Sequence, residues 1–255
     1  MSNYDVLGNI VIVKFPRTTK RSEKLRWAKA FLRERVSVTT VVEKIGKFKG
    51  RLRMQATRHL AGEHTKEALY KENACVFRLN VDSCYFSPRL AAERAEVASL
   101  VKPGEHVLVL FGGVAPFAIV IAKARKAARV VSVELSRTCN RYALENVKRN
   151  KVAVEVVAGD VRRVLPKINE KFDRVVMARP NLEEVFLDVA FPKVKRGGII
   201  HYYGFCKEPS LDVMKEMILE EATKAKRKIK IVRVKKAGDI GVRTWRYRID
   251  IKVVR

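Results

Sequence analysis

The feature that most constrains this chain is a regular alternation of short apolar runs and helical patterns from about residue 86 onward. The run from Val107 to Phe111 is continuously apolar, which is typical of a strand buried on both faces of a sheet. Alternating strands and helices of this kind indicate a parallel sheet with helices on both of its faces. We expect strands at 107–111, 129–134, 153–157, 172–177 and 198–203, and helices at 87–100, 117–128, 137–150 and 210–227.

The two ends of the chain show other patterns. Residues 229–234 and 244–253 alternate about a turn at Gly238–Asp239, which predicts a hairpin-like pair of strands. Residues 1–80 read as a small α+β unit rich in arginine and lysine, and 81–255 read as the second domain. In the first unit we expect strands at 4–15, 38–44, 50–62 and 66–81, and a helix at 22–34 that Ser22 caps.

The chain carries a large positive charge. Its 255 residues include 54 lysines and arginines against 27 aspartates and glutamates, a net charge of +27. A surplus of this size attracts polyanions, and counterion release from a phosphate backbone supplies affinity without sequence information. A general solubility role is the alternative, but a nucleic-acid partner is favoured. Charge alone does not separate RNA from DNA.

Membrane and secretion signals are missing from the sequence. No apolar run approaches the roughly 18 residues that a membrane span needs. Residues 1–5 lack the basic start and apolar stretch of a signal peptide. We therefore expect a cytoplasmic protein without a membrane partner. We also expect a monomer.

Cysteines and histidines are few. Cys75, Cys84, Cys139 and Cys206 include no pair at C-x-x-C spacing, so we expect no zinc site and no other metal site. A cytoplasmic protein keeps such thiols reduced, so disulfides are not expected either. We expect all four cysteines to be small buried apolar residues.

A glycine-containing loop follows the first buried strand. It comprises Phe111, Gly112, Gly113, Val114 and Ala115, and a helical pattern begins directly after it. Glycines let the backbone approach a ligand closely, and a helix N-terminus offers free N–H groups to a carboxylate. Ligands of open parallel sheets bind beyond the carboxyl ends of the strands. The loop is not G-x-G-x-x-G, however, and taken alone it is equally well a tight turn.

Acidic residues end the next two strands. Glu134 lies about twenty residues beyond the glycine loop, where a carboxylate can accept both ribose hydroxyls of an adenosine. Asp160 follows the third strand and can receive the adenine amino group. No G-x-x-x-x-G-K-[ST] phosphate loop is present. These features favour S-adenosyl-L-methionine over a dinucleotide, although a solvated carboxylate at a strand end remains the alternative for Glu134.

Several motifs resemble the tRNA (guanine-37-N1)-methyltransferases of archaea and eukaryotes. Residues 85–94 read YFSPRLAAER, and similar motifs occur in order over almost the full length, at 4–9, 60–63, 71–73 and 197–203. The resemblance implies an α/β, Rossmann-like class I methyltransferase fold, with a mostly parallel seven-stranded sheet and a C-terminal antiparallel hairpin, behind a small α+β domain. It also implies a tRNA partner, held by the anticodon stem-loop, without the family's additional elbow-contacting domain.

The same resemblance implies roles for individual residues. Glu93 would remove the proton from guanine N1, Arg53 would stabilise charge on the guanine oxygen, and Tyr85 would line the target-base pocket. An ordinary exposed glutamate in a first helical turn is the alternative for Glu93. The cofactor would contact Phe111 to Ala115, Glu134, Leu135, Asp160, Val161 and Ala178, and the substrate would contact Arg89, Arg179, Pro180 and Asn181.

Two departures from the family pattern weaken the substrate prediction. Ala178 stands where relatives carry an asparagine that contacts the guanine edge, and Leu135–Arg137 replaces their Asn-Pro. A related wybutosine-pathway aminocarboxypropyl transferase uses the same cofactor differently, but its helix-opening motif lacks the Arg89–Leu90 pair. Three hypotheses therefore stay open: a base N-methyltransferase, an aminocarboxypropyl transferase, and an RNA-binding protein with a decayed site.

Overall fold

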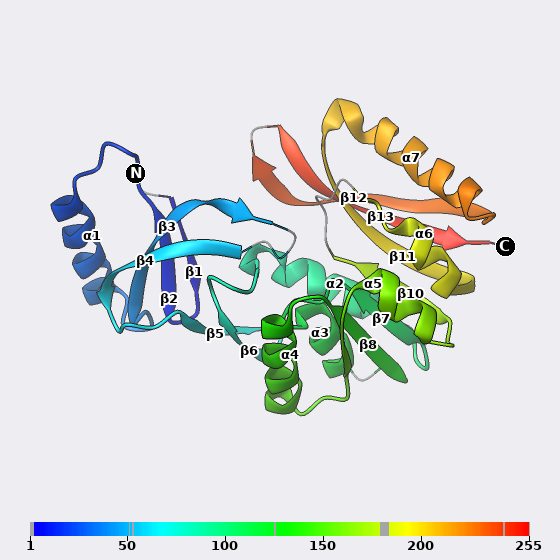
Figure 1. Cartoon of the computed structure of the whole chain (residues 1–255), viewed down its shortest axis with the longest axis horizontal. Helices are drawn as coiled ribbons and strands as arrows, with labels where there is room; N and C mark the ends of the chain where they lie inside the picture. The colour runs from blue at the N-terminus through cyan, green and yellow to red at the C-terminus, as the bar shows by residue number, and fades with distance from the viewer. Residues whose placement is uncertain are drawn as a thin grey trace.

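The computed structural model describes residues 3–50, 52, 54–124, 126–178, 184–241 and 243–254, without the side chains of 47–49. A small N-terminal unit lies beside a larger α/β unit (Figure 1). The strands of the small unit pair in chain order. Its elements are β1 (Asn3–Leu7), β2 (Ile10–Lys14), α1 (Arg21–Glu34), β3 (Thr40–Lys49) and β4 (Met54–Gly62).

Helix α1 covers one face of this small sheet. Ala28 and Phe31 of the helix are buried in one cluster with sheet residues such as Val41. The predicted cap, Ser22, is wrong, because the helix begins one residue earlier with Lys20 as its N-cap. The backbone N–H of Lys20 donates to the Glu23 carboxylate, a negative charge that the helix N-terminus favours.

The strand predicted at 4–15 is instead the antiparallel pair β1–β2, which turns at Gly8–Asn9. Gly8 has φ +60°, and a Cβ on it would meet the carbonyl oxygen of Leu69 at 1.9 Å, so only glycine fits this turn. The Asn9 side chain accepts from the Leu69 N–H and donates to the Glu67 carbonyl. The turn is thereby tied to the next hairpin.

That hairpin replaces the single strand predicted at 66–81. It consists of β5 (Glu67–Glu72) and β6 (Cys75–Asn80), which form a separate two-stranded sheet. Strand β6 is bound to helix α4 (Arg137–Asn150), since the side chains of Asn146 and Asn150 accept the N–H groups of Arg78 and Val76. The division of the chain at residue 80 stays a prediction.

A seven-stranded sheet forms the centre of the larger unit, in the order β12-β13-β11-β10-β7-β8-β9. The pairs from β11 to β9 are parallel, whereas β13 is antiparallel to both β11 and β12. The predicted Rossmann-like α/β class with a C-terminal antiparallel hairpin is therefore confirmed. The strands are β7 (His106–Leu110), β8 (Arg129–Glu134), β9 (Glu155–Ala158), β10 (Phe172–Met177), β11 (Val194–Lys207), β12 (Ile229–Gly241) and β13 (Thr244–Val253).

Helices cover both faces of this sheet. Successive residues of a strand point to opposite faces, so a continuously apolar strand leaves an apolar surface on each face for helices to cover. Leu108 and Leu110 lie in one buried cluster and Val107 and Val109 in another. The first cluster includes residues of α5 (Val161–Val164), α6 (Leu187–Ala190) and α7 (Leu211–Lys224). The second includes residues of α2 (Ala91–Leu100), α3 (Pro116–Lys123) and α4. No helix in the described part of the chain is long and apolar enough to cross a membrane.

Two details of the larger unit differ from the predictions. The helix predicted at 87–100 begins only at Ala91, because Pro88–Leu90 form a 3-10 turn before it. The closing hairpin reverses between Gly241 and Thr244, and Gly238–Asp239 lies at an irregularity within β12. Both predictions placed the end of an element at a serine, proline or glycine, whereas tertiary contacts determine where these elements begin and turn.

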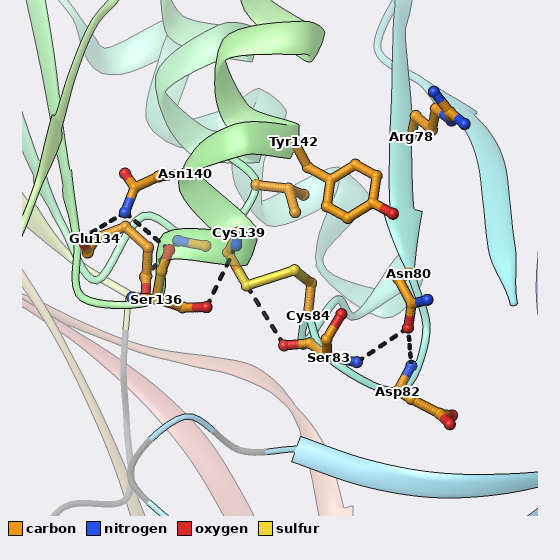
Figure 2. The surroundings of a disulfide bond; sticks show 12 residues. Arg78, Asn80, Asp82, Ser83, Cys84, Glu134, Ser136, Cys139, Asn140 and Tyr142 are labelled. Carbon is orange, nitrogen blue, oxygen red and sulfur yellow. Dashed lines mark hydrogen bonds between the residues drawn. A yellow bond between two sulfur atoms is a disulfide. The ribbon is translucent and has the colours of Figure 1, made fainter.

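The prediction that disulfides are absent is wrong. Cys84 and Cys139 form a disulfide with a Cα–Cα distance of 5.6 Å (Figure 2). The pair joins the loop after β6 to the first turn of α4, and it closes a loop with a sequence separation of 55. No spacing rule could reveal it, because the packing of the loop on the helix brings the two thiols together. Cys75 and Cys206 are free, and Cys206 is only partly buried.

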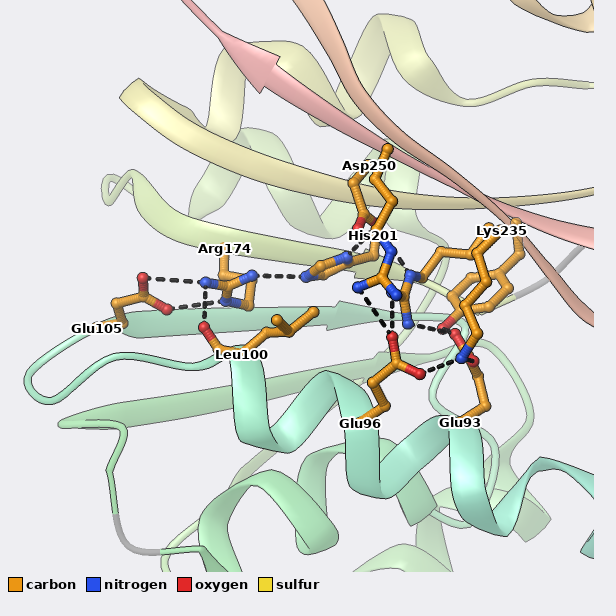
Figure 3. A network of polar contacts seen from close by, with 11 residues as sticks. Glu93, Glu96, Leu100, Glu105, Arg174, His201, Lys235 and Asp250 are labelled. Carbon is orange, nitrogen blue, oxygen red and sulfur yellow. Dashed lines mark hydrogen bonds and ion pairs between the residues drawn. The ribbon is translucent and has the colours of Figure 1, made fainter.

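A row of buried polar side chains crosses neighbouring strands of the large sheet (Figure 3). Arg174 on β10 pairs with Glu105 at 2.8 Å and lies 2.6 Å from Nε2 of His201 on β11. His201 in turn lies 2.6 Å from Asp250 on β13 through Nδ1. Because Arg174 can only donate, His201 accepts through Nε2 and donates to Asp250 through Nδ1, as a neutral imidazole. Burial lowers the pKa of His201 below its ordinary value of 6.5.

This buried histidine predicts a specific pH dependence of stability. The unfolded chain binds a proton at His201 more readily than the folded chain does, so folding loses stability as the pH falls below 6.5. The unfolding free energy should fall between about pH 7 and pH 5, and less steeply in His201→Gln than in the wild type. Urea titrations of both proteins across this range test the prediction, and equal slopes would contradict it. The pKa of Asp250 is also lowered, from 3.8, so its own contribution is lost only at more acidic pH.

Candidate functional site

The loop after β7 has an unusual backbone. Phe111, Gly113 and Ala115 all have positive φ, at +60°, +57° and +64°. Positive φ is strained for residues other than glycine, and such strain gathers at ligand sites. Gly112 lies against β8, where a Cβ would meet the Ser132 hydroxyl at 2.1 Å. The missing side chain of Gly112 thus lets this backbone lie close against β8, at the carboxyl ends of the strands and before the start of α3.

Glu134 at the end of β8 holds this loop. Its Oε2 accepts the N–H of Gly113 at 2.8 Å, and its Oε1 accepts the N–H of Ser136 at 2.7 Å. Ser136 also caps α4 through the N–H of Cys139. A carboxylate oxygen has two acceptor sites, so each oxygen of Glu134 can still accept a ribose hydroxyl. The donor and acceptor set at this strand end fits an adenosyl group.

The other predicted cofactor residues lie along the same edge of the sheet. Asp160 follows β9, caps α5 and accepts the Arg162 N–H at 2.9 Å. Val161 is buried beside it, Leu135 follows Glu134, and Ala178 follows β10. Since β10, β7, β8 and β9 are neighbours in the sheet, these residues and the glycine loop are adjacent. No group of three or more acidic, histidine or cysteine residues able to hold a metal occurs among the described residues.

A cavity of about 630 Å³ lies between the small unit and the large one. Tyr85 and Arg89 line it from the segment before α2, and Phe205 and Arg246 line it from the large sheet. The Tyr85 carbonyl oxygen would lie 3.8 Å from a Cβ built on Gly113, so one residue of the cavity wall lies against the glycine loop. Arg89 forms an ion pair with Asp5 at 2.7 Å, which joins the two units at the cavity wall.

Glu93 lies close by on helix α2 but is almost fully buried. Its side chain is 5% exposed, and Glu93 is not among the described residues that line the cavity. Its Oε1 accepts from the Tyr203 hydroxyl at 2.8 Å and from Arg248 at 2.6 Å, and its Oε2 from Lys235 at 3.2 Å. The alternative of a solvated surface glutamate is therefore wrong. Burial, together with the nearby negative charge of Glu93, raises the pKa of Tyr203 well above its ordinary value.

Comparison with known proteins gives this site a context. A family model described as the TRM5/TYW2 methyltransferase domain matches residues 68–234, and one described as the TYW2 N-terminal domain matches residues 1–65. The chain belongs to the TRM5/TYW2 methyltransferase family. The glycine loop, both predicted acids and Glu93 all lie within the range of its methyltransferase domain.

Members of the TRM5/TYW2 family from archaea are similar to nearly the whole chain. The tRNA (guanine(37)-N(1))-methyltransferase Trm5b of Pyrococcus abyssi is 34% identical, over 99% of this chain and 75% of that protein. The tRNA (guanine(37)-N(1))/4-demethylwyosine(37)-methyltransferase Taw22 of Nanoarchaeum equitans is 31% identical, over 99% and 100%. The crystal structure of P. abyssi Trm5b has a TM-score of 0.89, at 33% identity and the same coverage as in the sequence comparison. M. jannaschii TYW2 in complex with AdoMet has a TM-score of 0.75, at 25% identity, covering 99% of this chain and 100% of that one.

Some of the predicted TRM5/TYW2 site residues cannot be placed. Arg53, Arg179, Pro180 and Asn181 lie outside the described residues. Their roles stay predictions. Which residue takes the place of the family asparagine at Ala178 stays open.

Several residues that surround Glu93 were not predicted from the sequence. Tyr203, Lys235 and Arg248 come from three different strands, β11, β12 and β13. An available signal was the charged face of β13, where Arg246, Arg248 and Asp250 alternate with apolar residues.

Glu134→Ala should weaken the binding of S-adenosylmethionine at least about tenfold, since losing a charged hydrogen-bond partner costs roughly 1.5–3 kcal/mol. It also removes the acceptor that holds Gly113 in place. Titration calorimetry measures the effect, with the exposed Glu155→Ala on neighbouring β9 as a control that should bind like the wild type. Wild-type affinity in Glu134→Ala would count against the whole cofactor assignment.

Proposed function

We propose that this protein is an S-adenosylmethionine-dependent tRNA methyltransferase that transfers a methyl group to N1 of guanine 37. The observation that carries the proposal is the closeness of two features: an adenosyl-compatible loop held by Glu134, and a cavity whose wall residue Tyr85 lies against Gly113 of that loop. Relatives named for this activity, at 34% and 31% identity over 99% of the chain, support it. A structure of a relative with AdoMet, at 25% identity, supports the cofactor.

The residues divide the chemistry between them. S-adenosylmethionine, when bound, supplies an electrophilic methyl group. The backbone of Phe111–Ala115 and the carboxylate of Glu134 hold its amino-acid and ribose parts, while Asp160 takes the adenine amino group. Glu93 takes the proton from guanine N1 as general base. Tyr85 and Arg89 of the cavity wall hold the target nucleotide, since a base out of its stack needs edge and stacking partners.

The partner is tRNA, gripped at its anticodon stem-loop. The net charge of +27 supports a phosphate-backbone contact of this kind. We further propose that the protein acts as a monomer in the cytoplasm.

A second candidate function is aminocarboxypropyl transfer to a modified guanine at the same position. It is favoured by the match of residues 1–65 to the TYW2 N-terminal domain. The M. jannaschii protein named tRNA(Phe) (4-demethylwyosine(37)-C(7)) aminocarboxypropyltransferase is also 30% identical, over 78% of this chain and 77% of that protein. The presence of Ala178 where methyltransferase relatives carry an asparagine that contacts the guanine edge is also consistent with this candidate.

One experiment separates the candidates. The protein is incubated with unmodified tRNA, or with tRNA carrying 4-demethylwyosine, and with S-adenosylmethionine labelled either in the methyl group or in the aminobutyrate chain. Nucleoside mass spectrometry then identifies the product and its position. Methyl label at N1 of guanine 37 supports the proposal, whereas label arriving only from the chain rejects methyl transfer. No label from either source, with Glu134→Ala as the blank, would leave an RNA-binding protein.

A further inference from the structure

Arg248 is a buried arginine that reaches from β13 to helix α2. Its side chain is 0% exposed. One terminal nitrogen lies 2.6 Å from Oε1 of Glu93 and the other lies 2.7 Å from Oε1 of Glu96. Its Nε lies 3.0 Å from Oδ1 of Asp250. Burying a guanidinium is costly unless carboxylates surround it, and three carboxylates do so here.

The acids on α2 are joined by two cations. Arg248 bridges the Oε1 atoms of Glu93 and Glu96, and Lys235 bridges their Oε2 atoms (Figure 3 shows Lys235 above the two acids). Hydrogen bonds to Lys235 and Arg248 lower the pKa of Glu96 to about 2, against the cost of its burial. Glu93 and Glu96 are thus held as one rigid unit, although they come three residues apart on a single helix.

The two oxygens of Glu93 are not equivalent. A carboxylate oxygen can accept about two hydrogen bonds. Oε1 already has two donors, the Tyr203 hydroxyl at 2.8 Å and Arg248 at 2.6 Å. Oε2 has one donor among the described residues, Lys235 at 3.2 Å, which is the longest of the three contacts. Oε2 is therefore the oxygen with room for a proton.

We propose that Arg248 is a positioning residue for Glu93: together with Tyr203 it saturates Oε1 and so makes Oε2 the atom that takes the proton of the target base. The inference rests on the proposed function, in which Glu93 is the general base. In the reaction the N1–H bond breaks and its proton moves to Oε2. N1 keeps that electron pair and bonds to the methyl carbon, and the former sulfur–carbon pair stays on the sulfur of the cofactor.

The same network supplies a matched control. Arg174 is also a buried arginine, with a side chain 5% exposed, and it is held by Glu105, the Leu100 carbonyl and His201. Among the described residues it has no contact with Glu93. Arginine to lysine keeps the charge at either position but loses the fork that donates in two directions. A general cost of disturbing the network would therefore appear in both variants.

The test is a double-mutant cycle on methyl transfer to tRNA. Arg248→Lys should lower kcat at least about tenfold and change KM for tRNA and Kd for S-adenosylmethionine less than about twofold. Arg174→Lys should keep kcat within about twofold of the wild type. When Glu93→Gln already removes the base, adding Arg248→Lys should cost less than about twofold more, because a positioning residue acts only through its partner.

The outcomes separate this inference from the proposed function. An equal loss from Arg248→Lys with and without Glu93, or an equal loss in Arg174→Lys, would show that Arg248 is only structural. A wild-type rate in Glu93→Gln would overturn both the base and its positioning. Tyr203→Phe removes the other Oε1 donor and keeps the ring, so it tests the same geometry if Arg248→Lys does not fold. This variant should lower kcat severalfold. An unchanged kcat in Tyr203→Phe would overturn the inference.

Discussion

Replacing Glu93 by glutamine is expected to lower kcat by about 100- to 10,000-fold, the usual contribution of a general base. The amide keeps an acceptor oxygen for Tyr203 and Arg248, but its NH₂ group then faces the Lys235 ammonium, where the wild type has an acceptor. The amide nitrogen that replaces Oε2 only donates hydrogen bonds and has no basic lone pair with which to take the N1 proton. Affinity for S-adenosylmethionine should stay that of the wild type, since Glu93 lies outside the loop that Glu134 holds.

Single-turnover transfer of labelled methyl to tRNA measures this effect directly. Glu96→Gln is the comparison variant, because it removes an acid from the same helix and the same pair of cations. It should cost less than about tenfold, as a disturbance of orientation rather than loss of the base. Equal rates in the wild type and Glu93→Gln would remove Glu93 from the mechanism.

Breaking the Cys84–Cys139 disulfide should have the largest effect on stability. In the chain-entropy description, a cross-link closing a loop with a separation of 55 residues restricts the unfolded chain by about 4 kcal/mol. For a protein of this size that corresponds to a fall in Tm of about 10 °C. The two half-cystines are 2% and 3% exposed, so a reductant reaches them only when the loop opens.

Calorimetry of the wild type with and without a strong reductant tests this expectation. A double variant, Cys84→Ala with Cys139→Ala, should melt near the reduced wild type and should not respond to reductant. Cys75→Ala, at a buried but free cysteine, controls for the loss of a packed sulfur. The same Tm in reduced and oxidised wild type would mean that the bond adds nothing to stability.

Much of the fold was predictable because its strands are buried on both faces. The run 107–111 is continuously apolar, and 130–133 contains three valines bounded by Arg129 and Glu134, so the ends of both strands are easy to recognise in the sequence. Glu134 and the glycine loop lie at two of those ends, so the cofactor side of the site followed from the strands. Parallel neighbours bring such ends together whatever the helices between them do.

The environment of Glu93, by contrast, could not be predicted from local sequence patterns. It depends on side chains from β11, β12 and β13, which lie more than a hundred residues away along the chain. In β13, Arg248 and Asp250 alternate with apolar residues, a pattern typical of a half-exposed antiparallel strand. Helix α2 covers that face, so the charged residues became core residues. A periodic pattern shows that a face is polar but does not show what covers it.

The turn at Gly8–Asn9 and the disulfide illustrate the other limit. Each depends on one close approach between distant segments: Gly8 to Leu69, and Cys84 to Cys139. Local propensity contains no information about such approaches, although glycine followed by asparagine is a recognised turn signal.

The pairing of Arg248 with Glu93 has a consequence for how the protein is made. The two residues are separated by 155 positions, so a ribosome adding about 5–20 residues per second synthesises Glu93 roughly 8–30 s before Arg248. During that interval the nascent domain can wind its first strands and helices, but two neighbouring acids on α2 still await the arginine that will bridge them. The buried charge network around Glu93 is therefore completed late in biosynthesis, and a chain stalled before β13 would lack the arginine that bridges Glu93 and Glu96.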